Sequence, residues 1–271
     1  MTVVPELAGM QETGSDEDFG ARLRVDGILA GNELGIVFQP VVDLGTGATV
    51  GHEALARFAD GRPPNVWFAD ADRAGLGVEL ELLAIETALR AIPEDVPGYL
   101  GVNASPATLA SPRLRGMLQH TDGRRRLLLE LTERQAVAEY ALTGEGMAQM
   151  RAAGVLVALD DLGGHTAALR QLVDLNPDVV KIDRSLVSYI DEDPVRRALA
   201  TAFTQLALGL GWTVMAVGIE RHEELNTCHA LGIKYGQGYL LGRPAPLADP
   251  ALSSATSWIA LSEEIWQANQ G

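Results

Sequence analysis

Eight short apolar runs rich in β-branched residues recur between residues 35 and 240, and amphipathic segments separate most of them. The runs are residues 35–44, 48–58, 98–105, 126–133, 155–161, 178–183, 212–220 and 233–240. The segments between them carry apolar residues three and four positions apart, as amphipathic helices do. Strands that alternate with helices form a parallel sheet, and eight such units close into a barrel. We therefore predict an α/β fold, a (β/α)₈ TIM-type barrel.

The link between the first two runs differs from the others. Only the stretch GTGAT joins them, which is too short for a crossover helix, so this pair is expected to be antiparallel. Gly154, Gly211 and Gly232 stand where three helices should end before the next strand, a usual position for a C-terminal cap. The prediction is thus a barrel with an antiparallel first strand.

Composition divides the chain into three parts. Residues 1–20 are acidic and lack periodicity, which predicts a flexible tail. Residues 21–248 hold all eight runs without an internal repeat, which predicts one barrel domain. Residues 249–271 are predicted to form a final helix that packs on the barrel or on a partner. Trp258, Ile259, Leu261 and Trp266 of that helix are expected to make the contact.

Charge and composition exclude several classes of function. Lys and Arg total 21 against 36 Asp and Glu, a net charge of −15, which repels polyanions and argues against extended nucleic acid as a partner. A small phosphorylated ligand remains compatible, because bound divalent cations invert the local field. The chain has no apolar stretch of about 18 residues and no signal peptide pattern, so no membrane association is expected. The single cysteine, Cys228, builds no disulfide within one chain and fits a reducing cytoplasm.

Polar residues stand at the C-terminal ends of most predicted strands. In a barrel these ends meet at one face, where active sites form. Asp160 and Asp161 are direct neighbours in LDDLGG, and two adjacent carboxylates at a buried strand end are tolerated if a cation neutralises them. The complete set of strand-end residues is Glu53, Asn103, Glu130, Asp160, Asp161, Lys181, Asp183 and Gln237.

Oxygen ligands of this kind suit Mg²⁺ or Mn²⁺ better than Zn²⁺. Two such ions sharing an aspartate would activate water and steady the leaving oxygen in phosphodiester hydrolysis, with Lys181 stabilising negative charge. Each residue also has a plainer interpretation. Asn103 and Asp183 fit turn or N-cap positions, a strand-end Glu fits a solvated rim, and Lys181 fits the surface. Their coincidence at the same register of successive strands favours the metal site.

Six motifs resemble those of the EAL-domain family of bacterial cyclic di-GMP phosphodiesterases, from about residue 25 to 245. They are FQPVVDLGTGATVGHEALARF, VNASP, ELTE, LDDLGG, VVKIDRSLV and YGQGYLLGRP, in the order of the family. The resemblance implies a barrel with an antiparallel first strand and a phosphodiesterase, a metal-dependent hydrolase of cytoplasmic second-messenger signalling. Its expected partners are cyclic di-GMP and Mg²⁺ or Mn²⁺, and a homodimer is the default assembly.

The resemblance also assigns roles to individual residues. It implies one metal held by Glu53, Asn103, Glu130 and Asp160, and a second held by Asp160 and Asp161. Lys181 and Gln237 would lie near the attacking water, and together with Glu53 and Asp161 they form the implied catalytic set. The implied ligand-binding residues are Arg57, which would contact a phosphate, and Gln39, Leu55, Asp183 and Pro244. Glu133 would steady the loop that follows Asp161.

Two departures from the family pattern stand out. The family sequence A-E-G-[VI]-E reads AVGIE here, so Val217 replaces a carboxylate that is a second-metal ligand and is discussed as the general base. An isopropyl group neither coordinates a cation nor accepts a proton. The loop D-D-F-G-[TA]-G-Y reads DDLGGHT, which places His165 and Thr166 at the usual glycine and tyrosine positions after Gly164.

The combined prediction is a domain that binds cyclic di-GMP with a divalent cation at the C-terminal face of the barrel. Hydrolysis to linear pGpG is expected to be impaired or lost, since loss of a catalytic group costs about 10² to 10⁴ in rate. Rescue by Glu220, His165 or His222 is the less favoured outcome. The alternative is a catalytically inactive receptor or a protein-interaction module of cyclic di-GMP signalling.

Overall fold

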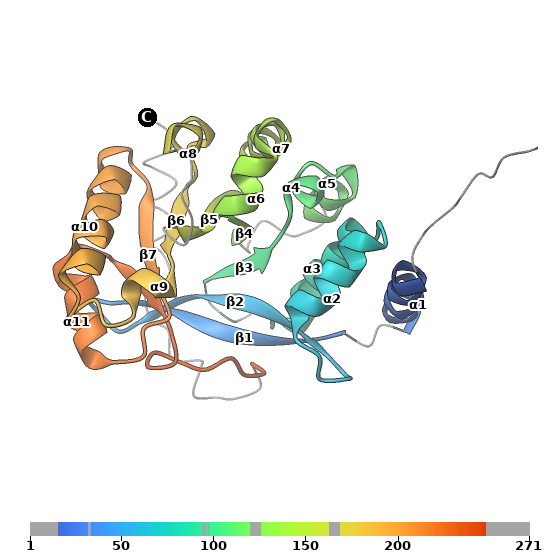
Figure 1. Ribbon diagram of the computed structural model, residues 1–271, viewed down its shortest axis with the longest axis horizontal. Helices are drawn as coiled ribbons and strands as arrows, with labels where there is room; N and C mark the ends of the chain where they lie inside the picture. Colours follow the sequence, from blue (N-terminus) through green and yellow to red (C-terminus); the bar gives the residue numbers. More distant parts are fainter. Residues whose placement is uncertain are drawn as a thin grey trace, which may run out of the picture.

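Eight strands form one closed barrel in chain order (Figure 1). The computed structural model describes residues 16–31, 34–93, 96, 98–119, 126–162 and 169–247. The strands are β1 (Leu34–Asp43), β2 (Thr49–Phe58), β3 (Tyr99–Asn103), β4 (Arg126–Thr132), β5 (Leu156–Leu162), β6 (Val179–Ile182), β7 (Thr213–Val217) and β8 (Tyr235–Gln237). The predicted α/β barrel is confirmed.

The strand β1 runs antiparallel to both of its neighbours, β2 and β8. The other neighbouring pairs are parallel. A tight turn makes the short first connection: Asp43 Oδ1 accepts the N–H groups of Gly45 and Thr46 at 3.0 and 2.8 Å, and Gly47 adopts a φ of 73°. Glycine adopts this left-handed conformation without strain. The prediction of an antiparallel first strand is therefore confirmed.

Helices surround the barrel, and α10 and α11 lie on the side opposite α1 (Figure 1). Three of them are followed by Gly154, Gly211 and Gly232, whose φ values of 73°, 79° and 85° confirm the predicted caps. The helices are α1 (Asp16–Gly31), α2 (Pro64–Arg73), α3 (Gly77–Ala91), α4 (Pro106–Leu109), α5 (Pro112–Gln119), α6 (Glu133–Ala138), α7 (Tyr140–Ala152), α8 (Leu169–Leu175), α9 (Arg184–Val187), α10 (Pro194–Gly209) and α11 (His222–Ala230).

The barrel interior is layered. Its lower layer is apolar and consists of Val41, Val50, Tyr99, Leu128, Ala158, Val179, Met215 and Tyr235. Side chains alternate between the two faces of a strand, so residues two positions further along also face inward. On β4, β5, β6, β7 and β8 these residues are Glu130, Asp160, Lys181, Val217 and Gln237. The alternation therefore stacks a largely polar layer on an apolar floor, toward the C-terminal ends of the parallel strands.

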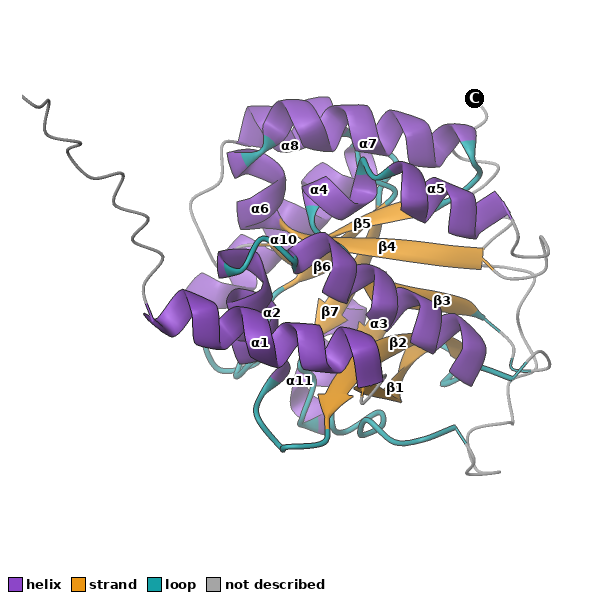
Figure 2. Ribbon diagram, turned by 90° about the vertical axis from the view of Figure 1, so that its right-hand side faces the viewer, coloured by secondary structure: helices purple, strands orange, loops and turns teal. Residues whose placement is uncertain are grey.

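The first helix, α1, belongs to the folded unit. Val25 and Ile28 pack with Trp67, and Arg24 Nη2 lies 2.6 Å from Asp70 Oδ2. Figure 2 shows α1 lying across α2 and α3. The predicted boundary between residues 20 and 21 falls inside this helix, which begins at Asp16. Residues 1–15 and the predicted helix at 249–271 lie outside the described residues, and none of the described helices is long and apolar enough to cross a membrane.

Candidate functional site

The polar layer centres on the ammonium of Lys181, which is 1% exposed. Its Nζ lies 2.5 Å from Glu130 Oε2 and 3.2 Å from both Glu53 Oε2 and Asp160 Oδ2. The four residues come from β6, β4, β2 and β5, so carboxylates far apart in the sequence meet at one point. Of the plainer interpretations, the surface position of Lys181 is wrong.

Burial and mutual charge shape the pKa values of this cluster. Burial raises the pKa of Glu130 to about 8, the charge of Glu53 adds to that effect, and Lys181 offsets it in part. Burial also raises the pKa of Glu53, but Lys181 and the amides of Gln237 and Asn103 outweigh burial and lower it. Burial lowers the pKa of Lys181, yet Asp160, Glu130 and Glu53 raise it well above its ordinary value. Lys181 therefore stays charged, and the carboxylates share a single cation.

Amide side chains complete the cluster. Asn103 Nδ2 donates to Glu53 Oε1 at 3.3 Å. Gln237 Nε2 donates to Gln39 Oε1 at 3.2 Å, and Gln39 Nε2 donates to the carbonyl oxygen of Gly242 at 3.0 Å. Gln237 Oε1 is buried and has no hydrogen-bond partner among the described residues. A buried acceptor of this kind is a place for a water, an ion or a ligand group.

The two neighbouring aspartates sit at a break in the strand pattern. Asp161 adopts a φ of 61°, an uncommon value for a residue other than glycine that aspartate tolerates better than most. The register of β5 against β6 shifts between Leu159 and Leu162, and the backbone N–H of Asp161 donates to Asp160 Oδ1 at 2.8 Å. In a regular strand the side chains of Asp160 and Asp161 would point to opposite faces of the sheet. The irregular backbone at Asp161 interrupts this alternation.

A glycine makes room for the buried carboxylates. Gly101 lies in register with Glu53 on one side and Leu128 on the other. A Cβ atom at this position would collide with Oε1 of Glu130. Because glycine leaves this space open, Glu130 can extend beneath Asn103 toward Lys181.

The residues expected to bind a ligand lie around the cluster. Arg57 is exposed, and its Nη1 bonds to the adjacent carbonyl of Ala56 at 2.7 Å, which leaves the guanidinium largely accessible. Leu55 and Arg57 line a cavity of ≈ 440 Å³ that also reaches Asn103 and Glu130. Half-buried Pro244 precedes Ala245, which bridges to β1 next to Gln39. Leu55 and Arg57 therefore share a cavity with Asn103 and Glu130, whereas Gln39 and Pro244 are not among the residues that line it.

The same cavity extends between the barrel and α2 and α3, where Glu81 lines it. Glu81 Oε2 accepts the backbone N–H and the hydroxyl of Ser105 at 2.7 and 2.9 Å, and burial raises the pKa of Glu81. Ser105 in turn caps α4 by accepting the N–H of Thr108. Glu81 thus anchors the turn that follows Asn103.

Asp183 fulfils its plainer interpretation. Its Oδ1 accepts the N–H of Ser185 at 2.9 Å and caps α9, so a ligand role for this residue stays a prediction. The side chain of Glu133 and residues 163–168, which include Gly164, His165 and Thr166, lie outside the described residues.

Val217 takes its expected place at the end of β7, in register with Gln237 of β8. Gly218 follows with a φ of 81°, and the N–H groups of Gly218 and Ile219 both donate to the carbonyl oxygen of Gln237, at 2.8 and 3.0 Å. Val217 therefore supplies no carboxylate beside Gln237.

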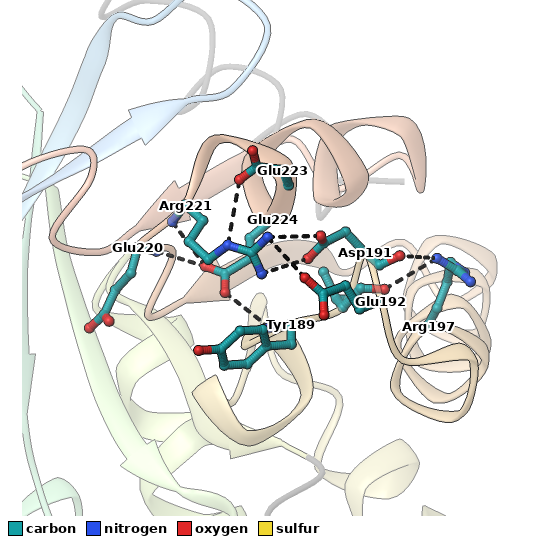
Figure 3. Close-up of polar contacts among 9 residues, drawn as sticks. Tyr189, Asp191, Glu192, Arg197, Glu220, Arg221, Glu223 and Glu224 are labelled. Atoms are coloured by element: carbon teal, nitrogen blue, oxygen red, sulfur yellow. Dashed lines mark hydrogen bonds and ion pairs between the residues drawn. The ribbon is translucent and has the colours of Figure 1, made fainter.

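A second polar cluster, which the sequence did not reveal, joins the loops after β6 and β7 (Figure 3). Glu224 is 2% exposed, and its carboxylate accepts the backbone N–H groups of Tyr189, Glu220 and Arg221 at 3.0, 2.9 and 3.1 Å. Arg221 pairs with Asp191 at 3.1 Å. The sequence signal that could have revealed this cluster is Glu224 at the third position of α11, where a capping box places a glutamate.

The donor chemistry at the Lys181 cluster fits a divalent cation. Carboxylate and amide oxygens are ligands that Mg²⁺ and Mn²⁺ prefer, and the carboxylates outnumber the one ammonium. As arranged, however, no three His, Cys, Asp or Glu side chains in the described ranges form a group that holds a metal ion. The oxygens instead surround Lys181 Nζ.

Comparisons with known proteins bear on the family and on the fold. A sequence profile of the EAL domain matches residues 22–244. The probable cyclic di-GMP phosphodiesterase PdeB of Escherichia coli K12 is 30% identical over 243 residues, which cover 83% of this chain and 45% of that protein. This chain spans between 25% and 45% of the length of the curated relatives that it matches.

Two solved structures extend the similarity to three dimensions. The PaMucR phosphodiesterase in complex with cyclic di-GMP is 28% identical with a TM-score of 0.72, covering 79% of this chain and 98% of that one. BlrP1 of Klebsiella pneumoniae, in its complex with manganese and cyclic di-GMP, is 27% identical with a TM-score of 0.72, covering 79% of this chain and 56% of that one.

Proposed function

The chain belongs to the EAL domain family, and from that membership we propose that it binds cyclic di-GMP with Mg²⁺ or Mn²⁺ at the mouth of its barrel. One observation carries the proposal: Glu53, Glu130 and Asp160 converge from three strands, within 3.2 Å of one ammonium. The named relatives support the ligand, because PaMucR and BlrP1 were each solved with cyclic di-GMP.

The residues that would hold the ions are those of the polar layer. Glu53, Asn103, Glu130 and Asp160 would hold one ion, and Asp160 and Asp161 would hold the second. When bound, divalent cations polarise a phosphate and activate a water for attack. The Oε1 of Gln237, which has no hydrogen-bond partner within the described part of the chain, is suited to orient that water.

The chain's own side chains would position the nucleotide. The guanidinium of Arg57 is exposed at the mouth and suits a phosphate oxygen, because its planar donors bind such oxygens in pairs. The cleft would be lined by Gln39, Leu55 and Pro244. One carboxylate oxygen of Asp183 caps α9, and the other oxygen would contact the ligand.

Hydrolysis to linear pGpG is proposed to be impaired or lost. Val217 lies beside Gln237 and supplies neither a metal ligand nor a base, so a rate about 10² to 10⁴ below that of a relative with glutamate there is expected. The alternative is a catalytically inactive receptor, which binds cyclic di-GMP without turning it over, or a protein-interaction module of cyclic di-GMP signalling. The receptor requires the same binding residues, since only the reaction is lost.

Two measurements on the purified chain test the proposal. Calorimetry with cyclic di-GMP and Mg²⁺ or Mn²⁺ should detect binding, and chromatography should detect little or no pGpG. Absence of binding with either cation would contradict the proposed function. Turnover equal to that of a relative with glutamate at the Val217 position would contradict the proposed role of Val217.

A further inference from the structure

The use of lysine in this chain is unusual. The sequence has 2 lysines, Lys181 and Lys234, against 19 arginines. In the described part of the chain arginines provide the surface ion pairs, whereas the buried cluster uses Lys181. A guanidinium is a planar fork, while an ammonium is a compact point charge with three donors. The buried cluster therefore contains the more compact of the two kinds of cation.

Three carboxylate oxygens surround Lys181 Nζ. The ammonium donates hydrogen bonds to Glu130 Oε2 and Glu53 Oε2, at 2.5 and 3.2 Å, and forms an ion pair with Asp160 Oδ2 at 3.2 Å. The second oxygens of two of these carboxylates are also engaged: Glu53 Oε1 accepts Asn103, and Asp160 Oδ1 accepts the N–H of Asp161. The carboxylates are thus oriented toward a single central cation.

The oxygens around the ammonium are also the oxygens proposed to hold a metal. These carboxylates outnumber the one ammonium, which favours the binding of a divalent cation. Yet no three acidic, His or Cys side chains in the described ranges form a metal-holding group as arranged. An ion therefore binds at the cost of contacts that Lys181 makes in this structure.

We propose that the Lys181 ammonium is the resident cation of the metal-free site, which holds Glu53, Glu130 and Asp160 together and competes with a divalent cation for their oxygens. The inference rests on the proposed function, because it takes these oxygens to be the metal ligands. Lys181 is in this sense a positioning residue that keeps the site assembled until the ion enters.

Competition predicts opposite effects of removing Lys181. The metal-free Lys181→Met variant should unfold at a temperature several degrees lower, because the buried Glu53 and Glu130 and the partly buried Asp160 lose the ammonium that pairs with them. The same variant should bind Mg²⁺ about tenfold more tightly, since the ion no longer displaces a competitor. A lysine with a purely structural role would leave Mg²⁺ affinity unchanged or weaken it.

The two lysines allow a direct measurement on the unaltered chain. Protein labelled with ¹⁵N at the lysine Nζ atoms yields two ammonium resonances, with exposed Lys234 as the internal control. Titration with Mg²⁺ alone should shift the Lys181 resonance with the dissociation constant that calorimetry reports. The Lys234→Met variant assigns the two signals and should bind Mg²⁺ as the unaltered chain does.

The outcomes separate this inference from the proposed function. Mg²⁺ binding that leaves the Lys181 resonance in place overturns the inference alone. If neither the unaltered chain nor Lys181→Met binds Mg²⁺, the proposed metal site is wrong and the inference falls with it. Should Lys181→Met fail to fold, the resonance of the unaltered chain still decides between displacement and no displacement.

Discussion

The ammonium of Lys181 on β6 lies 2.5 Å from Oε2 of Glu130 on β4, although β5 runs between these two strands. The contact crosses the barrel interior, because both side chains project inward from the layer above the apolar floor. Asp160 of β5 joins them at 3.2 Å. Closure of the barrel, and no local feature of any strand, is what assembles this charged centre.

The first prediction concerns the missing carboxylate. Val217→Glu places a carboxylate beside Gln237, and it should raise the rate of pGpG formation about 10²-fold or more if that carboxylate is the only defect. Chromatography of pGpG with Mn²⁺ measures the change. Val217→Gln is the matched control, since an amide of the same size accepts no proton. Equal rates for both variants would shift the cause to the loop at residues 164–166.

The second prediction concerns ligand binding at Arg57. Loss of a charge-assisted phosphate contact typically costs about 1.5–3 kcal/mol, so Arg57→Ala should weaken cyclic di-GMP binding by tenfold or more in calorimetry. Thermal stability should change little, since the guanidinium is exposed. Arg90→Ala removes a similarly exposed arginine that pairs with Glu86 on α3. Equal affinities of the two variants would rule out the phosphate contact.

A third prediction tests the carboxylate that joins the loops after β6 and β7 (Figure 3). Glu224→Gln removes one of two acceptor oxygens that serve three backbone N–H groups. The part-buried donors left unpaired should lower the free energy of unfolding by about 1–2 kcal/mol. Glu223→Gln is the control, because its carboxylate is 60% exposed and pairs with Arg221 at 3.5 Å, a contact worth about 1 kcal/mol or less. Urea denaturation of both variants measures the difference, and equal losses would count against Glu224.

The fourth prediction is a loss of stability in acid that involves His52. This residue is 1% exposed, neither ring nitrogen has a hydrogen-bond partner among the described residues, and burial lowers its pKa to about 4. The unfolded chain binds a proton at an ordinary pKa of about 6.5, so the unfolded state gains protons first as pH falls. Stability should fall by about 3 kcal/mol between pH 6.5 and pH 4 from this residue.

Denaturation at pH 7, 5.5 and 4.5 measures this effect. The His52→Leu variant should lose less stability over the same range, because it carries no titrating ring. His222→Gln replaces an exposed histidine and should follow the unaltered chain. If His52→Leu shows the same acid dependence as the unaltered chain, His52 is not the cause.

Local patterns sufficed for the framework of this protein. β-Branched runs and the glycines after helices predicted all eight strands and three caps, because alternation and φ > 0 are preferences of single residues and their neighbours. The five-residue link GTGAT sufficed to predict the antiparallel pair, since a crossover helix needs more chain. The strand-end residues Glu53, Glu130 and Asp160 followed from the same pattern.

Other features were decided by tertiary structure alone. The sequence suggested a surface position for Lys181 as readily as a site position, and only the closed barrel buries its ammonium among three carboxylates. Packing also decided that Arg24 pairs with Asp70 and that Glu224 accepts the N–H of Tyr189, because in both cases the two partners lie on different elements. Contacts between residues far apart in the chain depend on how elements pack, and no periodicity within one element encodes them. The sequence therefore determined which side chains reach the barrel mouth, and packing determined which charges meet there.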